Sequence, residues 1–201
     1  MSVARLALSG AVGYALGTLP SADIASRLAA RGTADPVDLR AAGSGNPGAA
    51  NAAKVLGNTW GLAVLGADIA KGVAAGFVGR AIAGDRGAYL AATAVVGGHI
   101  APAWNGFRGG KGIATSAGTC LAVFPAYFGV DLLVAAMGAA GSRNAERATQ
   151  LSAVAFVTAA AVWARRDLPN AWGPRPSAGL VAFAATTSAM ILAKFALSRR
   201  A

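Results

Sequence analysis

The sequence has little of the material from which most catalytic and metal sites are built. Its 201 residues include one cysteine, one histidine and eight acidic residues. One cysteine excludes an internal disulfide, and a single Cys with a single His cannot supply a zinc site. The chain contains no G-x-S-x-G nucleophile elbow, no H-x-x-x-x-D motif and no closely spaced pair of carboxylates. We therefore expect no metal and no cofactor, and we interpret Cys120 as a small core residue.

Charged residues are also scarce. They make up 13% of the chain, against about 25% in an average soluble domain. Hydrophobic residues make up 55%, and the mean hydropathy is +0.52. This balance favours an integral membrane protein over an alanine- and glycine-rich soluble helical protein. The net charge of +10 is dispersed over short polar segments, so we expect contact with anionic membrane lipid and no nucleic-acid partner.

Several apolar stretches approach the ~20 residues that a helix needs to cross a bilayer. No stretch alternates like a barrel strand, so an all-α protein is expected. The stretch 113–140 is too long for one span, and we predict two shorter helices that meet near Phe124 and Pro125. The N-terminal stretch has Arg5 as its single basic residue and is interpreted as a retained span, not a signal peptide. The expected fold is one polytopic domain over residues 1–201 with about seven transmembrane helices, taken from 3–20, 55–78, 87–104, 113–140, 151–163 and 177–197.

The basic residues indicate an orientation, because an odd number of spans places the termini on opposite sides. With the C-terminus inside, the inner segments hold Arg27, Arg31, Arg40, Lys54, Arg108, Lys111, Arg143, Arg147, Lys194, Arg199 and Arg200. The outer segments hold Arg5, Arg80, Arg86, Arg165, Arg166 and Arg175. The larger inner set predicts an N-out/C-in topology, although Arg5 argues against it. Two polar loops, at about 21–54 and 105–112, are then expected in the cytoplasm.

Two glycine-rich polar runs stand out between the apolar stretches. The first extends over 43–51 with the sequence GSGNPGAAN, and the second comprises GHIAP at 98–102 followed by FRGGKGIAT at 107–115. Such runs expose backbone N–H groups, and Lys111 adds a cation, which is how proteins hold phosphate. Residues from Ile113 onward are predicted to begin a helix, whose free N–H groups would add to an anion site. The runs predict phosphate handling at a membrane surface.

Two better-known phosphate motifs fit poorly. Gly43, Gly45 and Gly48 match G-x-G-x-x-G, but the preceding segment 35–42 is a polar loop and not a buried strand, so the dinucleotide interpretation fails. The P-loop pattern would need Gly at position 105 and Ser or Thr at position 112, where the chain has Asn105 and Gly112. Many other glycines are interpreted as small residues at helix contacts, for example the pairs 57/61 and 72/76.

Four charged or titratable residues lie within apolar stretches. Asp68 and Lys71 are three residues apart on a predicted helix, so they can face one another. They are interpreted either as a structural ion pair or as substrate contacts. His99 is interpreted either as a general base or as a residue that braces a loop. Asp131 has no evident partner in the sequence and is left unassigned.

These residues resemble a known family. The segment Leu16–Ala22, then Asp38-Leu39-Arg40, the run 43–51, Asp68 with Lys71-Gly72, and the run 98–115 occur in the order seen in PlsY, the bacterial acyl-phosphate:glycerol-3-phosphate acyltransferases. The resemblance covers roughly residues 14–118. It implies a multi-pass protein of the bacterial plasma membrane that moves an acyl chain from acyl-phosphate to the 1-hydroxyl of glycerol 3-phosphate. The product would be lysophosphatidate for phospholipid synthesis, and a soluble enzyme that supplies acyl-phosphate is a possible partner.

The resemblance also implies roles for individual residues. Lys111, Ser44, Asn46 and His99 are expected at the catalytic centre, with Asp68 and Lys71 in support. The residues expected to bind substrate phosphate are Arg40, Gly45, Asn51, Lys54, Arg108, Gly109, Gly110, Gly112 and Thr115.

The chain departs from the family pattern in several places. Ala50 and Lys54 stand where Thr and Arg are usual, and Arg108 replaces Lys. The loop 142–152 lacks a usual Tyr-Val-Ser-Leu pattern, and the chain ends without the usual His, Asn and Arg motif, so Lys194, Arg199 and Arg200 are the available substitutes. Two alternatives therefore stay open. One is a diverged relative with another acceptor or no activity, and the other is a non-enzymatic lipid or phosphate carrier.

Overall fold

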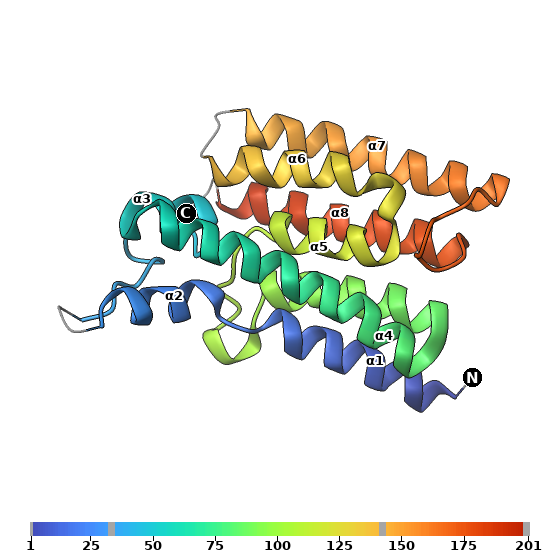
Figure 1. Ribbon diagram of the computed structural model, residues 1–201, viewed down its shortest axis with the longest axis horizontal. Coiled ribbons are helices and arrows are strands. Elements are labelled where there is room, and N and C mark those ends of the chain that lie inside the picture. The colour runs from blue at the N-terminus through green and yellow to red at the C-terminus, as the bar shows by residue number, and fades with distance from the viewer. Residues whose placement is uncertain (1, 32–34, 141–143, 199–201) are drawn as a thin grey trace.

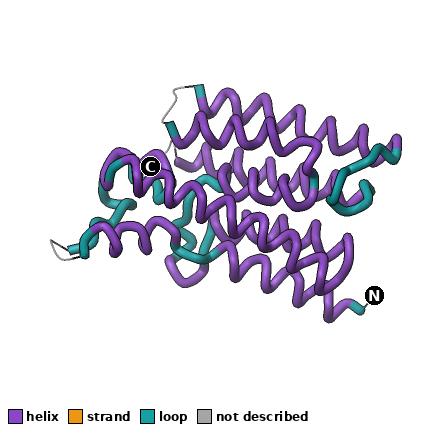
Figure 2. The backbone as a smooth tube through the Cα atoms, in the orientation of Figure 1, coloured by secondary structure: helices purple, strands orange, loops and turns teal. Residues whose placement is uncertain are grey.

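The computed structural model describes residues 2–31, 35–140 and 144–198, and every regular element in those ranges is helical (Figure 2). This confirms the all-α prediction for the described residues. Two single 3₁₀ turns lie at Ala103–Asn105 and Pro125–Tyr127. The helices are α1 (Val3–Gly17), α2 (Ser21–Ala29), α3 (Ala49–Leu56), α4 (Asn58–Ile100), α5 (Ile113–Val123), α6 (Phe128–Ala139), α7 (Ala145–Arg166) and α8 (Ala178–Ser198).

Helix α4 is a hairpin of two arms. Ala83 and Gly84 leave helical geometry, and Gly84 has a φ of 57° and a ψ of −156°, a conformation that suits glycine. The chain therefore reverses, so that Gly79 on the first arm packs against Gly87 and Ala91 on the second. The reversal falls in the gap between the predicted stretches 55–78 and 87–104.

The long apolar stretch 113–140 also divides in two. Helix α5 ends at Val123, a 3₁₀ turn begins at Pro125, and α6 begins at Phe128. Proline has no N–H to continue the helical hydrogen bonds, which explains the break. The prediction of two shorter helices that meet near Phe124 and Pro125 is confirmed.

The helices lie along the long axis of the molecule and leave two distinct ends (Figure 1). The motif end, as we call it, carries α2, α3, the segment 101–112 and the last turn of α8. The other end carries the first turn of α1, the α4 reversal and the loop between α7 and α8. Both glycine-rich runs therefore reach the same end. The polar segment 21–54 was expected to be a loop. It also contains α2 and the greater part of α3.

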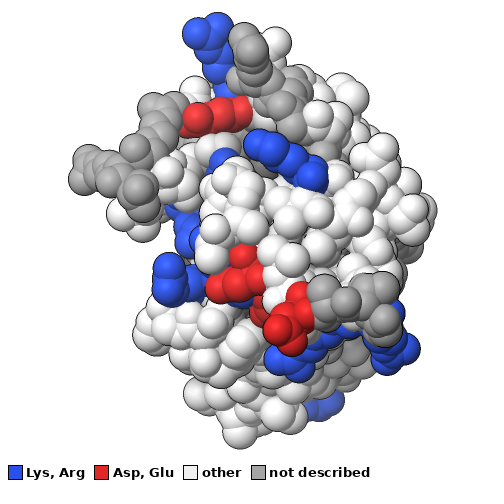
Figure 3. Space-filling view, turned by 90° about the vertical axis from the view of Figure 1, so that its left-hand side faces the viewer, with Lys and Arg blue, Asp and Glu red and all other residues white. Residues whose placement is uncertain are grey.

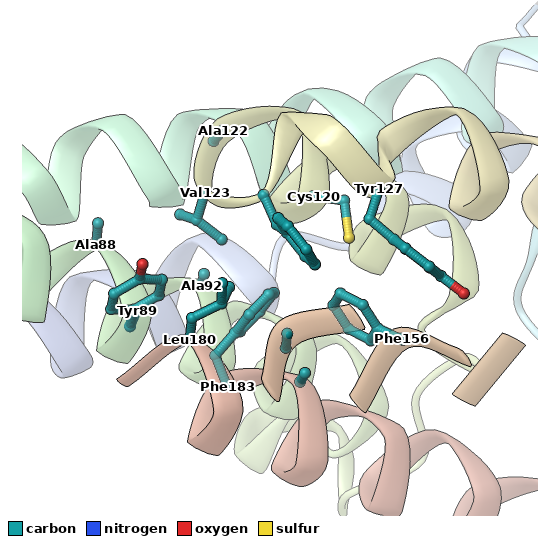
Figure 4. Close-up of a cluster of buried hydrophobic side chains, with 13 residues drawn as sticks. Ala88, Tyr89, Ala92, Cys120, Ala122, Val123, Tyr127, Phe156, Leu180 and Phe183 are labelled. Atoms are coloured by element: carbon teal, nitrogen blue, oxygen red, sulfur yellow. The ribbon is translucent and has the colours of Figure 1, made fainter. Parts of the chain in front are cut away.

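An aromatic cluster fills the core between α4, α5, α7 and α8 (Figure 4). Phe124 stacks on Tyr127 and Phe156, with ring centroids 5.9 and 6.1 Å apart. Phe183 meets Phe156 edge-on at 5.6 Å. Such contacts add about 0.5–1.5 kcal/mol per pair to the effect of burial. The cluster holds this part of the bundle together without extending to the motif end.

Small residues allow α4 and α5 to approach closely. A Cβ at Gly72 would collide with the carbonyl of Thr115, and a Cβ at Gly76 would lie 2.5 Å from that of Ala122. The predicted helix-contact role of the 72/76 pair is therefore confirmed. The 57/61 pair is wrong in part. Gly57 lies between α3 and α4, where a Cβ would meet nothing within 4 Å, whereas Gly61 packs against Ala53.

Two segments of the described chain are long and apolar enough to cross a membrane. They are 58–105, which includes the α4 hairpin and has a mean hydropathy of 1.5, and Ala178–Ser198, with a value of 1.8. Helices α5 and α6 are apolar but only 11 and 12 residues long. At 1.5 Å per residue each covers roughly half of a 30 Å hydrocarbon layer.

Candidate functional site

A cavity of about 330 Å³ lies between the two glycine-rich runs. Ser44 and Asn46 line it from the first run, and Lys111 and Gly112 line it from the second. Asp68 and His99 contribute from the two arms of α4. Apolar side chains complete the wall, namely Leu65, Ile113, Ala135 and Phe195. Residues far apart in the sequence thus form one site with a polar and an apolar side. The four residues expected at a common centre, Ser44, Asn46, His99 and Lys111, all line this cavity.

Asn51 shapes the first run from inside. Its Nδ2 donates to the carbonyls of Leu39 and Ala42 at 2.8 and 2.9 Å, and its Oδ1 accepts from the Ser44 N–H at 2.8 Å. The residue is 1% exposed and does not line the cavity. Asn51 was expected to bind phosphate, but its side chain is committed to the loop, and what it does is hold Ser44 in place.

Gly109 and Gly110 close the end of α4. Their N–H groups donate to the carbonyls of Ile100 and His99, both at 3.1 Å. These carbonyls lack helical partners at a helix C-terminus, which explains the bonds. The expectation that both amides bind phosphate is therefore not met in this structure. Glycine at these two positions lets the second run pack closely against His99. A Cβ at position 109 would collide with the His99 carbonyl, and a Cβ at position 110 would lie 3.0 Å from His99 Cε1.

Helix α5 begins at the cavity. Gly112 precedes it with a φ of 87°, a left-handed conformation that glycine adopts readily. Gly112, Ile113 and Ala114 all line the cavity. The first turn of a helix carries N–H groups without helical partners and a partial positive charge, which together favour an anion. The predicted helix start beside Lys111 is thus confirmed, and it faces the cavity.

Lys111 is half-buried beside this helix start. Its Nζ lies 4.3 Å from the centroid of the Phe195 ring, a cation–π contact that fixes the ammonium at the cavity wall. Burial lowers the pKa of Lys111 below the usual value for lysine, and the nearby carboxylate of Glu146 opposes that shift. Glu146 also lines the cavity.

Asp68 is the centre of a buried polar cluster that connects the cavity to α2. Its Oδ1 lies 2.9 Å from Lys71 Nζ and accepts a hydrogen bond from Ser21 Oγ at 2.8 Å. His99 Nδ1 lies 3.6 Å from the same oxygen. Lys71 also donates to the carbonyl of Leu19 at 3.3 Å. The predicted Asp68–Lys71 pair is confirmed, and Asp68 and His99 face the cavity as well.

Arg40 lies on the other side of this cluster. Its guanidinium binds both oxygens of Asp23, at 2.6 and 3.2 Å, and its Nε donates to the carbonyl of Arg108 at 2.9 Å. With Lys71, it lines a second, smaller cavity of about 30 Å³ that shares Asp68 and His99 with the first. Arg40 therefore joins the two glycine-rich runs through α2 and does not line the main cavity.

Four other expected residues do not line the main cavity either. Lys54 and Arg108 are exposed. Gly45 lies in a turn in which its N–H donates to the Ala42 carbonyl. Thr115 is fully buried in α5, and its hydroxyl has no hydrogen-bond partner.

On the surface of the motif end, Lys and Arg side chains are interspersed with Asp and Glu side chains (Figure 3).

Two cavity residues were not anticipated from the sequence. Glu146 lies in the first turn of α7, where an acidic residue is common for helix stability alone. Phe195 lies near the end of the last apolar stretch and looks like any core aromatic. Lys111 lies 35 residues before Glu146 and 84 residues before Phe195. Nothing in the sequence indicates that either residue approaches Lys111.

The arrangement suits an anion attached to an apolar group. Lys111 and the α5 start offer a positive region, and Ser44 and Asn46 offer hydrogen bonds. The apolar wall is contiguous with them. Among the described residues, no group of three or more His, Cys, Asp or Glu side chains could hold a metal ion.

Comparisons with known proteins agree with this picture. The model of the glycerol-3-phosphate acyltransferase family matches residues 7–199. A glycerol-3-phosphate acyltransferase of Cereibacter sphaeroides is 43% identical over 118 residues, which cover 59% of this chain and 56% of the relative. One of Synechococcus elongatus is 41% identical over 150 residues and covers 68% of each chain. The match to the first relative thus spans little more than half of its length.

Solved structures give a fuller overlap. PlsY, described as an integral membrane glycerol 3-phosphate acyltransferase, matches in its glycerol 3-phosphate form with a TM-score of 0.75 and 26% identity. Its lysophosphatidic acid form matches with a TM-score of 0.71 and 25% identity. Both matches cover 97% of this chain and 90% of the solved one. With the fold shared throughout and the family model matched from residue 7 to residue 199, this chain is a membrane protein that belongs to the glycerol-3-phosphate acyltransferase family.

Proposed function

We propose that this protein transfers an acyl chain from acyl-phosphate to the 1-hydroxyl of glycerol 3-phosphate and yields lysophosphatidate for phospholipid synthesis. The observation that carries the proposal is the single cavity that joins Lys111, the α5 start, Ser44 and Asn46 to an apolar wall. Both substrates carry phosphate, and one of them also carries an acyl chain. The cavity offers a cation and free helix N–H groups for the phosphates and an apolar surface for the chain.

The proposed reaction needs little more than positioning. The 1-hydroxyl oxygen attacks the carbonyl carbon of acyl-phosphate, a mixed anhydride that is already activated. A C–O ester bond forms, the C–O bond to phosphate breaks, and inorganic phosphate leaves. The hydroxyl proton goes to a substrate phosphate. Lys111 stabilises the negative charge that develops on the carbonyl oxygen and the leaving phosphate, as preorganised cations do.

The other cavity residues have supporting roles in this proposal. Ser44 and Asn46 orient the phosphate by hydrogen bonds. His99 is held between Asp68 and Gly110 and keeps the second run in position, because a substrate phosphate takes the hydroxyl proton in this proposal. Arg40 and Lys71 line the smaller cavity on the far side of Asp68. Their side chains add positive charge near the site.

We further propose a single polytopic domain that crosses the bacterial plasma membrane about seven times. The spans would be α1, the two arms of α4, the shorter α5 and α6, α7 and α8. The motif end would face the cytoplasm, with the N-terminus out and the C-terminus in. Most of the basic residues assigned to the inner side belong to elements at the motif end, which supports this orientation. Arg143, Arg199 and Arg200 lie outside the described residues. A soluble enzyme that makes acyl-phosphate would approach from that side.

The test is transfer of a radiolabelled acyl group from acyl-phosphate to glycerol 3-phosphate by the purified protein in detergent. Lys111→Ala should lower the rate at least about 100-fold, the typical loss when a transition-state contact is removed. Arg166→Ala, which removes an exposed charge at the opposite end, is the matched control and should leave the rate unchanged. Full activity of folded Lys111→Ala would refute the role of Lys111. No lysophosphatidate from the wild type, with acyl-phosphate still bound, would instead indicate a different acceptor.

A further inference from the structure

A second polar centre lies in the apolar interior, beside the cavity of the proposed reaction and separated from it by one turn of α5. Asp131 on α6 is 8% exposed. Its Oδ2 lies 3.0 Å from both Ser116 Oγ and Cys120 Sγ on α5, and its Oδ1 lies 3.3 Å from Ser152 Oγ on α7. One carboxyl group thus joins three helices, and two of the three hydroxyl or thiol partners belong to α5. Cys120 is fully buried in the aromatic cluster, as expected of a small core residue, and its thiol also donates to Asp131.

The negative charge of Asp131 has no basic partner nearby. Every salt bridge found in the described ranges joins other residues, and Asp131 is in none of them. The titratable groups that face it are Cys120 and Tyr127, and neither carries positive charge. An unpaired carboxylate in a low-dielectric interior costs several kcal/mol even when it is hydrogen-bonded. Asp131 must therefore bind a cation or hold a proton.

A small cavity next to the carboxyl group has room for a cation. Its volume is about 30 Å³, and its polar wall consists of Asp131, Ser116, Ser152, Thr149 and Ser188. A bound proton needs no such space, whereas about 15 Å³ is enough for one water molecule and thus for an ion of similar size. Each of these four hydroxyl residues is less than 10% exposed.

The hydroxyl groups are free to act as ligands. Thr149 Oγ1 donates to the Ala145 carbonyl, and Ser116 and Ser152 donate to Asp131. Ser152 Oγ also lies 3.3 Å from Tyr127 Oη. A hydroxyl oxygen has two lone pairs, so each of these oxygens keeps at least one. Ser188 adds an oxygen from α8. Carboxylate and hydroxyl oxygens are hard ligands, which suit hard cations. One carboxylate balances a single positive charge, so a divalent ion would leave a net charge in the interior.

We propose that Asp131, Ser116, Ser152, Thr149 and Ser188 form a sodium site that ties α5, α6, α7 and α8 together. The ion neutralises Asp131 and is held by oxygens from four helices. The site lies one turn along α5 from the Ile113 start that lines the main cavity. Sodium would therefore stabilise the bundle and hold α5 in its position beside Lys111.

Thermal unfolding in detergent tests the proposal directly. The melting temperature Tm is measured in NaCl, KCl and choline chloride at equal ionic strength. Sodium at about ten times its Kd would multiply the folded-to-unfolded ratio about tenfold, which for a chain of this size raises Tm by about 3–6 °C. Asp131→Asn should lose the sodium dependence, and Asp35→Asn, an exposed aspartate, should retain it. Equal Tm values of the wild type in all three salts would overturn the proposal.

A second measurement uses the wild type alone and so does not depend on the folding of a variant. A hydrophobic carbodiimide, dicyclohexylcarbodiimide, modifies protonated carboxyl groups in apolar surroundings, and peptide mass spectrometry locates the adduct. Sodium should protect Asp131 from modification in a concentration-dependent way, whereas choline should not. Modification of Asp131 at the same rate with and without sodium would overturn the proposal and identify a protonated carboxyl group instead.

Discussion

His99 and Asp68 meet across the two arms of the α4 hairpin, with His99 Nδ1 3.6 Å from Asp68 Oδ1. The same oxygen binds Lys71 on its own arm and Ser21 on α2. One buried carboxylate thus fixes the separation of the two arms and the position of α2. The His99 ring, held on one side by Asp68, rests against Gly110 of the second glycine-rich run on the other. The geometry of the cavity therefore depends on the buried charge of Asp68, which also forms part of the cavity wall.

Asp68→Asn should destabilise the protein strongly. The side chains of Asp68 and Lys71 are 3% and 5% exposed, so the variant leaves an ammonium group buried without its counter-charge. Removing one partner of a buried pair costs about 3 kcal/mol or more, which should lower Tm by about 6–12 °C for a chain of this size. Adding Lys71→Met should restore part of the loss. If the Tm of the double variant is no higher than that of Asp68→Asn, the ion pair is not the source of the stability.

Gly110→Ala should impair acyl transfer more than folding. The new methyl group would lie 3.0 Å from His99 Cε1 and 3.3 Å from the Pro47 carbonyl, so the imidazole must leave its position between Asp68 and Gly110. A displacement of about 1 Å in a catalytic group can cost roughly 100-fold in rate. Gly66→Ala, where a Cβ meets nothing within 4 Å, is the matched control and should keep full activity. Unchanged kcat/KM in folded Gly110→Ala would show that the position of His99 is not critical.

Local sequence features were enough to predict much of this structure. Apolar stretches indicated the helices, Pro125 indicated the break between α5 and α6, and the i, i+3 spacing placed Asp68 against Lys71. The family resemblance, and not a local pattern, implied one centre for Ser44, Asn46 and Lys111, and these three residues line one cavity. The local features depend on residues close together in the chain or on runs of distinctive composition.

Contacts between distant residues account for what the sequence did not reveal. Asn51 and the amides of Gly109 and Gly110 occur in glycine-rich runs that are typical of phosphate-binding loops. Their hydrogen bonds nevertheless go to backbone groups that only the folded chain brings near. Asp131 lacked a visible partner because Ser152 is 21 residues away on another helix. A polar residue in a glycine-rich run can bind a ligand or complete the loop, and composition alone does not distinguish the two.

Gly72→Ala should weaken the contact between α4 and α5. The added Cβ would overlap the Thr115 carbonyl and lie 2.9 Å from the Thr119 nitrogen, both of them backbone atoms that cannot rotate away. Overpacking of this kind costs about 1–3 kcal/mol, so Tm should fall by about 2–12 °C. Gly129→Ala on α6 meets nothing within 4 Å and should leave Tm unchanged or raise it. A Tm for Gly72→Ala equal to that of the wild type would show that the helices can separate at little cost.

The pH dependence of acyl transfer should identify Lys111 as the essential cation. Burial lowers the pKa of Lys111, so its charge is complete below that lowered pKa and is lost as the pH rises through it. The kcat/KM, which reports on the free enzyme, should therefore decline on an alkaline limb below the usual range for lysine.

Two variants should move this limb in opposite directions. Lys111→Arg keeps its charge at any accessible pH, because the guanidinium pKa exceeds 12, so the decline should shift to higher pH. Glu146→Gln removes the carboxylate that raises the pKa of Lys111, so the decline should shift to lower pH. A pH–rate profile measured from neutral to strongly alkaline pH checks both shifts. A limb that stays in place in both variants would mean that another group controls it. Opposite shifts would be hard to explain unless the Lys111 charge itself contacts the reacting phosphate.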